Sequence, residues 1–298
     1  MKFYGQFDPP VDRFLFERYF PDRGISGIFV ECGAFDGLTE CSCKFFEESL
    51  GWSGFNLEPV PALFAALQRN RPNSRNLQLA LSDRGGLSLF RHVHHPNLGE
   101  HFGNGSITHA PDHLADLKAR GCTVEEIEVL TITWRDFTDK EGIDQVDLLV
   151  LDVEGHEMQV LKGMKGGRVW PLVMCIEYGH IGLGRLRSEM SSLGYEYDIS
   201  SNANAFFVRR DVLPLFALRR SRMPAEYSND ADEAICRLEH TLQHLKEREQ
   251  VLLSHIESIE RSRGVRDKVA KPCLRSCLTK VLELQPRTHP RAVFAGGD

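Results

Sequence analysis

An uninterrupted apolar run, residues 148–151, ends abruptly at an acid, Asp152. Glu154, a glycine, His156 and a helix-like spacing of apolar residues follow it. This pattern predicts a strand that is buried on both faces of a parallel sheet, then a tight turn and a helix. Ligands of open α/β sheets bind at the carboxyl ends of the strands, so we expect Asp152, Glu154 and His156 at the rim of a site. The alternative interpretation is that Asp152 only caps the helix that follows.

Two earlier segments repeat the pattern of a short apolar strand that ends at an acid. Residues 27–30 lead to Glu31 and to a loop with Gly33 and Gly37, where glycine lets the backbone come close to a ligand. Residues 54–57 lead to Glu58, which lies 27 positions after Glu31. A nucleotide-binding βαβ unit places its ribose-binding acid at about this interval.

The remaining elements up to residue 215 alternate between strands and helices, as in an α/β sheet. Further strands are expected at 76–81, 87–90, 127–131 and 172–177, with 87–90 as the hairpin partner of 76–81. The histidine-rich stretch 92–113 has no apolar period and is expected to be a surface loop or lid. Strands at 195–199 and 205–208 form a terminal antiparallel hairpin, whereas a plain dinucleotide-binding domain ends in a parallel strand. We therefore predict a class I (Rossmann-like) methyltransferase fold with a seven-stranded, mostly parallel sheet.

The end of the chain differs in character from the rest. After a linker at 216–228, apolar residues occupy seven of eight a/d positions of a heptad pattern in 229–263, and Glu249 is the exception. This spacing predicts a long helix, either a two-stranded coiled coil that makes the protein a homo-oligomer or a helix packed on the body. Residues 264–298 are expected to be a flexible basic tail. Positions 261–298 carry a net charge of +6, and the other residues carry a net charge of −12, which together give the −6 of the whole chain.

Composition limits the class of protein further. No apolar stretch reaches eighteen residues, and the first residues lack the basic and apolar regions of a signal peptide, so neither a transmembrane segment nor secretion is predicted. Eight scattered cysteines then indicate reduced thiols in the cytoplasm, and their spacing does not fit a structural zinc site. The histidines of 92–113 are interpreted as solvated, with metal binding as the alternative. The tail holds one aromatic residue, which argues against nucleic-acid binding by base stacking.

The loop after each of the first three strands suits one part of a nucleoside ligand. The loop that starts at Gly33 can cradle the carboxylate and amino group of a methionine-like moiety. Glu58 can accept both ribose hydroxyls, and Ala80, Leu81 and Ser82 can face an adenine edge. This combination predicts S-adenosylmethionine. Phe35 takes the place of the middle glycine of G-x-G-x-x-G, which disfavours NAD, and no P-loop sequence occurs.

The chain also resembles a known family at five motifs in register, from about Gly5 to Asp211. The run 31–37 is similar to the D/E-x-G-A-x-x-G signature of the FkbM family of S-adenosylmethionine-dependent methyltransferases. The further similar motifs are E-P-x-P at 58–61, A-L-S-D at 80–83, a loop serine at Ser106, and D-V-E-G-x-E with L-K-G at 152–163. The resemblance implies O-methylation of a hydroxyl on a small molecule or glycan. It also implies a cofactor site made of Glu31, Gly33, Ala34, Asp36, Gly37, Glu58, Ala80, Leu81 and Ser82.

A hydroxyl is a poor nucleophile, so its proton must be removed as the new bond forms. We expect Asp152 or His156 to be the general base and Glu154 to orient the acceptor. A divalent metal held by Asp152, Glu154 and a third acid is an alternative activator. Glu177 and Tyr178 are expected to line the acceptor pocket, while His180 can be an ordinary loop histidine.

Two other functions compete with this one. The first is a methyltransferase-like binding module that acts through its coiled coil, and the second is an NAD-dependent oxidoreductase. A degenerate module would be expected to lose its buried acids, because they cost stability without a ligand. The retained Glu31, Glu58 and the block 152–157 therefore favour an enzyme.

Overall fold

The computed structural model describes residues 1–99, 102–214 and 216. The predicted coiled-coil helix, the basic tail and all but Phe216 of the linker lie outside this described part. No helix in the described ranges has both the length and the apolar character needed to cross a membrane.

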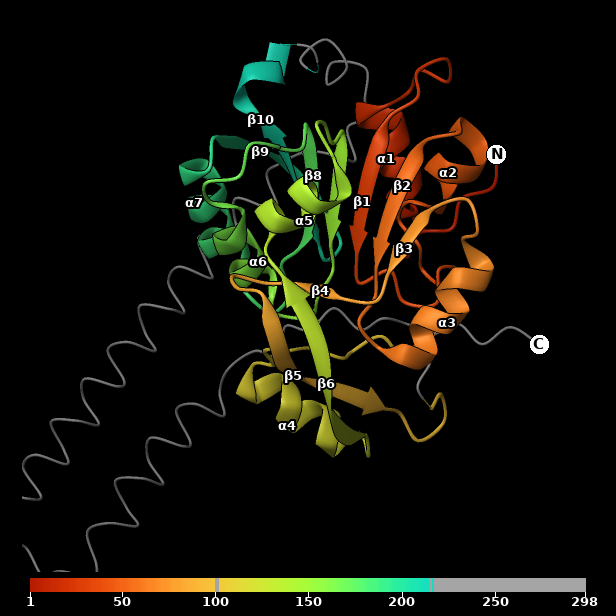
Figure 1. Ribbon diagram of the computed structural model, residues 1–298, viewed down its shortest axis with the longest axis vertical. Coiled ribbons are helices and arrows are strands. Elements are labelled where there is room, and N and C mark those ends of the chain that lie inside the picture. The colour runs from red at the N-terminus through yellow and green to blue at the C-terminus, as the bar shows by residue number, and fades with distance from the viewer. Residues whose placement is uncertain (100–101, 215, 217–298) are drawn as a thin grey trace, which may run out of the picture. The chain divides into compact units, whose positions relative to one another are not determined.

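The described chain is built on a seven-stranded sheet (Figure 1). The strands in spatial order are β3 (Arg75–Leu77), β2 (Ser53–Leu57), β1 (Ile28–Cys32), β7 (Leu148–Leu151), β8 (Val173–Glu177), β10 (Asn204–Arg209) and β9 (Tyr195–Ser201). The first five are parallel, while β10 runs antiparallel between β8 and β9. The order reverses between β1 and β7, and this is the switch point where open α/β sheets bind ligands. The sheet and the terminal hairpin confirm the predicted fold class.

Helices cover both faces of this sheet because its central strands are apolar on both sides. One face packs on α5 (Trp134–Glu141), α6 (Glu157–Met164) and α7 (Leu183–Ser192), through the inward side chains of β1, β7 and β8. The opposite face packs on α1 (Val11–Tyr19) and α2 (Lys44–Leu50), largely through phenylalanines. Helix α3 (Pro61–Asn70) follows β2 and contacts β3. A short 3-10 helix, Arg210–Val212, ends the regular structure.

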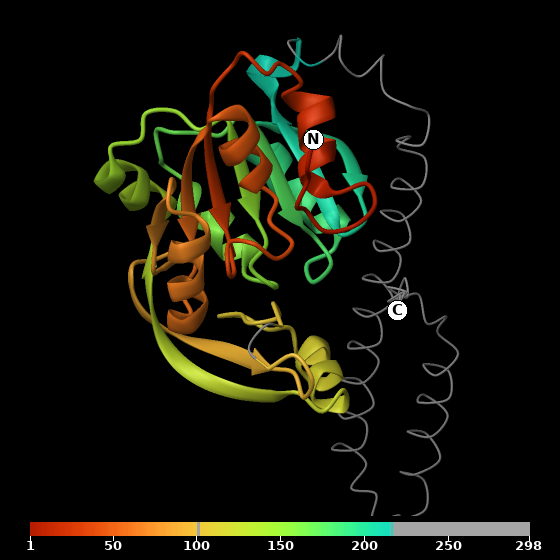
Figure 2. The ribbon, with the colours of Figure 1, turned by 90° about the vertical axis from the view of Figure 1, so that its right-hand side faces the viewer.

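A second, three-stranded sheet has the order β4 (Ala80–Leu81), β6 (Thr123–Ile132) and β5 (Gly86–His94), and α4 (Pro111–Ala119) accompanies it. Figures 1 and 2 show β5, β6 and α4 beyond the edge at which β1 and β2 end, where the arch of β6 reaches back toward the main sheet. This sheet therefore stands next to the ligand-binding edge.

The second sheet corrects two expectations. The predicted strand 76–81 is divided between β3 in the main sheet and β4 in the small one. Residues 87–90 do not pair with it, because β5 pairs over its whole length with β6 instead. Alternation of side chains identifies extended residues, but the pairing partner depends on chain segments that are distant in sequence.

Candidate active site

The loop after β1 contacts the loop after β7 through backbone atoms. The amides of Gly33 and Ala34 donate to the carbonyl of Leu57, each at 3.1 Å, which holds the loop against the end of β2. Gly33 has a φ of 80°, and a Cβ at this position would lie 1.9 Å from the carbonyl oxygen of Asp152. Only glycine fits here. The predicted methionine-binding loop and the predicted catalytic block are thus in direct contact.

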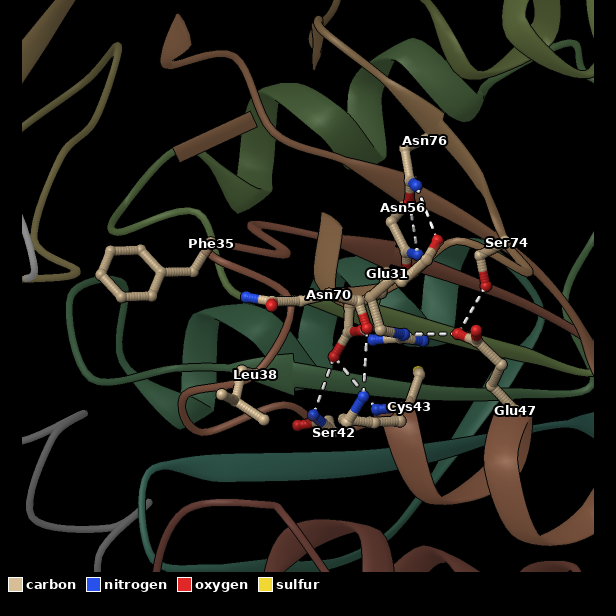
Figure 3. Close-up of polar contacts among 12 residues, drawn as sticks. Glu31, Phe35, Leu38, Ser42, Cys43, Glu47, Asn56, Asn70, Ser74 and Asn76 are labelled. Carbon is tan, nitrogen blue, oxygen red and sulfur yellow. Dashed lines mark hydrogen bonds and ion pairs between the residues drawn. The ribbon is translucent and has the colours of Figure 1, made fainter. Parts of the chain in front are cut away.

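Glu31 is held by the protein itself (Figure 3). Its carboxylate accepts hydrogen bonds from the amides of Ser42 at 2.8 Å and Cys43 at 3.0 Å, and from the Arg71 guanidinium at 3.2 Å. Arg71 has no exposed surface and also pairs with Glu47. Glu31 therefore anchors the segment between β1 and α2, and it can shape the predicted methionine pocket through this segment.

Asp36 folds the same loop locally. Its carboxylate accepts from the amides of Leu38 at 2.8 Å and Thr39 at 2.7 Å, and from the Thr39 hydroxyl at 2.8 Å. Gly37 follows with a φ of 75°, close to Leu67. These contacts give the loop after Gly33 a fixed backbone path.

Glu58 has the strongest features of a ligand-binding acid in this half of the site. The residue is 5% exposed, and within the described ranges its carboxylate accepts hydrogen bonds from two backbone amides, those of Phe35 at 3.1 Å and Val60 at 2.9 Å. Burial raises the pKa of Glu58 to about 8, although both amides lower it. Phe35 adopts a left-handed φ of 52°, and Figure 3 shows its ring pointing away from the Glu31 group. Further hydrogen bonds to Glu58 would stabilise its charged form.

The residues predicted for the adenine differ in how they are placed. Ala80 is partly exposed, whereas Leu81 and Ser82 are buried. The Ser82 hydroxyl lies 3.0 Å from Nε2 of His156, and its amide donates to the carbonyl of Ile132. The polar side chain of Ser82 already contacts the protein, and the placement of Ala80, Leu81 and Ser82 beside an adenine stays a prediction.

His156 joins three segments of the chain. Its Nε2 faces Ser82, and its Nδ1 lies 2.9 Å from the hydroxyl of Thr108. The ring is 3% exposed, and burial lowers its pKa to about 4. Both ring nitrogens therefore contact side chains of the protein, and the role of His156 as a general base stays a prediction.

Three carboxyl groups meet where β7 and β8 end. Asp152, Glu154 and Glu177 each offer an oxygen within 4.8 Å of the other two. Their closeness follows from the topology, because β7 and β8 are parallel neighbours. Burial raises the pKa of Asp152 and of Glu177 well above the usual range, and neighbouring carboxylates add to this. Among the ion pairs of the described residues, none joins these acids to Lys or Arg.

Glu157 fixes the turn that carries the middle acid of this group. It accepts from the amides of Val153 at 3.1 Å and Gly155 at 3.2 Å. Glu154 itself has a left-handed φ of 53°, followed by Gly155 at 97°. A side chain at Gly155 would also meet the carbonyl oxygen of Thr108 at 2.9 Å, so glycine is required.

The stretch 92–113 is not the surface loop that the sequence predicts. Residues 92–94 belong to β5 and residues from Pro111 onward belong to α4. Between them, residues 96–99 are exposed, whereas Ser106 and Thr108 contact the turn after β7. The Ser106 hydroxyl donates to the carbonyl of Val153 at 3.1 Å, and Ser106 is buried. The polar composition of this stretch predicted exposure to solvent, but polar side chains can also be buried when they form hydrogen bonds within the protein.

Several functional residues were missed or undervalued from the sequence. The sequence pattern did not predict that Arg71 pairs with Glu31. An acid inside an apolar strand does, however, indicate that a cationic side chain is buried next to it. His180 is more than an ordinary loop histidine, because its Nε2 lies 2.8 Å from the Glu154 carboxylate. His113 stacks on it, with ring centroids 4.0 Å apart. Neither contact has a signal in local sequence.

Sequence comparison identifies the class to which this fold and site belong. The family described as the Methyltransferase FkbM domain matches residues 31–197, which include the loops after β1, β2, β7 and β8. The chain belongs to this family of methyltransferases. No curated protein matches the sequence.

Solved structures resemble the chain at low sequence identity. The FkbM methyltransferase from Methylobacillus flagellatus KT is 14% identical, with 61% of this chain and 43% of that one covered and a TM-score of 0.38. This chain thus spans less than half of that protein. The N-terminal domain of human METTL16 in complex with SAH is 12% identical, with coverages of 66% and 65% and a TM-score of 0.33. The precorrin-6y C5,15-methyltransferase from Geobacter metallireducens GS-15 is 11% identical, with coverages of 67% and 87% and a TM-score of 0.34.

Proposed function

We propose that this protein is an O-methyltransferase that modifies a hydroxyl group on a glycan or small molecule. The contact between Gly33 and the carbonyl oxygen of Asp152 is the observation that carries the proposal. It brings the loop after β1, proposed to hold the methionine part of the cofactor, next to an acid cluster that can handle a proton. The proposed cytoplasmic location rests on the sequence features described above.

The residues on the cofactor side fit S-adenosylmethionine. The backbone at Gly33 leaves no room for a side chain, and Glu58 presents a buried carboxylate with acceptor capacity beyond its two amide donors. When bound, the cofactor supplies a methyl group on a positively charged sulfur. Glu58 would accept the two ribose hydroxyls, and Ala80 would contact the adenine.

Asp152 is the proposed general base. It follows β7 directly and keeps some exposed surface, unlike His156, so an acceptor hydroxyl can reach its carboxylate. Asp152 would take the proton from the acceptor oxygen as that oxygen bonds to the methyl carbon. Glu154 and Glu177 would orient the acceptor through its other hydroxyls, which donate to carboxylates. The remaining rate acceleration would come from alignment of the acceptor oxygen with the methyl group of the cofactor.

The cofactor is tested first by calorimetric titration of S-adenosylmethionine, and separately of NAD, into the protein. We expect micromolar binding of S-adenosylmethionine that Glu58→Ala removes. Binding of NAD alone would overturn the assignment. If neither ligand binds, alone or with added saccharides, the binding-module alternative gains support.

The acceptor and the base are tested with radiolabelled S-adenosylmethionine and a panel of mono- and disaccharides, sugar alcohols and phenols. We expect a methyl ether, located by tandem mass spectrometry, and a loss of about 10²–10⁴-fold in kcat for Asp152→Asn. The matched control is Asp147→Asn, which removes an acid at the opposite end of β7. Methylation of nitrogen, or full activity of Asp152→Asn, would contradict the proposal.

A further inference from the structure

A group of imidazole and carboxylate side chains lies at the acceptor side of the site, and the proposed reaction does not use all of it. His113, Glu154 and His180 each offer one ligand atom, and these atoms lie within 4.8 Å of one another. His180 comes from the segment after β8, Glu154 from the turn after β7, and His113 from α4 of the second sheet. The group therefore joins the two sheets.

The tautomer of His113 is fixed by its neighbour Asn104. Nε2 of His113 lies 3.2 Å from the side-chain carbonyl oxygen of Asn104, which can only accept, so Nε2 carries the hydrogen. Nδ1 then bears a lone pair, and this atom is buried without a hydrogen-bond partner among the described residues. Metal-binding histidines usually donate a hydrogen bond from one ring nitrogen to a neighbouring group, and the lone pair of the other ring nitrogen binds the metal.

His109 repeats the same arrangement independently. Its Nε2 donates to the backbone carbonyl of Asn104 at 2.8 Å, and its Nδ1 is also buried and unpartnered within the described ranges. The residue is only 7% exposed, and its ring centroid lies 5.3 Å from that of His113. A buried polar atom that lacks a partner costs about 1–3 kcal/mol. Two such lone pairs in one cluster point to a ligand that accepts electron pairs.

The negative charge of the neighbouring carboxyl groups also favours binding of a cation at this group. Asp152 and Glu177 add two more carboxyl groups around Glu154, and no Lys or Arg of the described chain forms an ion pair with the three. Among the described residues, Glu154 of this cluster forms an ion pair with His180, and this ion pair needs a protonated imidazole ring. A divalent ion would offset the surplus negative charge whatever the protonation of the ring.

We propose that His113, His180 and Glu154 bind a divalent transition-metal ion of the Zn²⁺, Mn²⁺, Fe²⁺ or Co²⁺ class, with His109 as an adjacent donor. Two imidazoles and one carboxylate suit these ions, whereas Mg²⁺ prefers oxygen ligands only. Because the rings of His113 and His180 are stacked at an interplanar angle of 15°, at least one ring would turn so that both nitrogen lone pairs point at the ion. The ion would then replace the hydrogen bond between His180 and Glu154 and hold α4 against the turn after β7.

The test uses the untagged full chain, freed of metal with a chelator and titrated with Co²⁺, without cofactor or acceptor. We expect visible absorption bands typical of nitrogen and oxygen ligands and, for the tightest site, one ion per chain. His180→Ala and His113→Ala should weaken binding about 10–100-fold, in the range seen for altered metal environments. The matched control is His94→Ala, from a similar group of His92, His94 and Glu125 on the second sheet.

His180 is partly exposed, so its replacement should lower the melting temperature of the metal-free protein only slightly, through the lost contacts with Glu154 and His113. Equal Co²⁺ affinity in all variants, loss of binding only in His94→Ala, or an absorption band from sulfur ligands would overturn the site. Binding of Mg²⁺ that survives both histidine replacements would show instead an all-carboxylate site at Asp152, Glu154 and Glu177. Because no methyl transfer is measured, failure here is separate from failure of the proposed function.

Discussion

The ligand-binding edge of the sheet has two halves, one at the ends of β1 and β2 and one at the ends of β7 and β8. Their buried acids differ in whether they have partners within the described protein. At the ends of β1 and β2, Glu31 is paired with Arg71, and Glu58 accepts two backbone amides. At the ends of β7 and β8, Asp152 and Glu177 crowd together without a Lys or Arg partner in the described part of the chain. The acids of the first half have partners within the protein, whereas those of the second half are proposed to receive a positively charged or hydrogen-donating ligand. The comparison predicts opposite signs when a charge is removed from each half.

The largest effect should come from the contact between the halves. Gly33→Ala places a methyl group against the carbonyl of Asp152 at a left-handed φ. We expect failure to fold or a loss of more than about 5 kcal/mol in unfolding free energy. Gly51→Ala is the control, because Gly51 has a φ of 66° but nothing within 4 Å of its Cβ position. That change should cost about 1 kcal/mol in urea denaturation. Similar losses in both variants would contradict the role of the contact.

On the β1 and β2 side, Arg71→Met leaves Glu31 and Glu47 buried without their cation. Removing one partner of a buried pair costs about 3–5 kcal/mol, because the remaining charge is uncompensated. Arg75→Met, which breaks the exposed pair with Glu141, should cost about 0–1 kcal/mol. Denaturant unfolding measures both. A loss below about 1 kcal/mol for Arg71→Met would mean that the pair does not organise this half.

Glu58 gives the cofactor half a pH dependence. Burial raises its pKa from 4.5 to about 8, so the free protein loses stability as the pH rises through this window. Ribose hydroxyls favour the charged form, so S-adenosylmethionine affinity should increase up to tenfold per pH unit and level off above about pH 8. Calorimetric titration at several pH values measures this slope. Glu58→Gln should bind weakly with a flat profile, and a sloping profile in that variant would assign the titration to another group.

The smallest effect should be found on the β7 and β8 side, with the opposite sign. Glu177→Gln removes one of the crowded carboxyl groups and keeps the shape of the side chain. We expect the free protein to gain about 1 kcal/mol of stability at pH 8, because like charges no longer compete, while methyl transfer falls. Thermal unfolding and the transfer assay measure the two changes. A destabilised Glu177→Gln protein would mean that this half is satisfied internally and does not await a ligand.

The sequence was sufficient for the parts that depend on local pattern. Apolar strands that end at Glu31, Glu58 and Asp152 predicted the order of the elements, and the terminal hairpin predicted the class of fold. Sequence interpretation failed where pairing is distant, as in the division of 76–81 between β3 and β4. It also failed where polar residues of an expected surface loop are buried, as with Ser106 and His109.

The amino-acid sequence by itself determined which acids and glycines stand at strand ends, because side-chain period and chain breakers act over a few residues. Only the tertiary structure decided which of these groups are already partnered. Arg71 reaches Glu31 across 40 positions, and His180 reaches Glu154 across 26. Such contacts depend on how distant segments of the chain pack, so the local sequence pattern does not predict them. The difference between the partnered acids at β1 and β2 and the crowded acids at β7 and β8 is therefore a property of the fold.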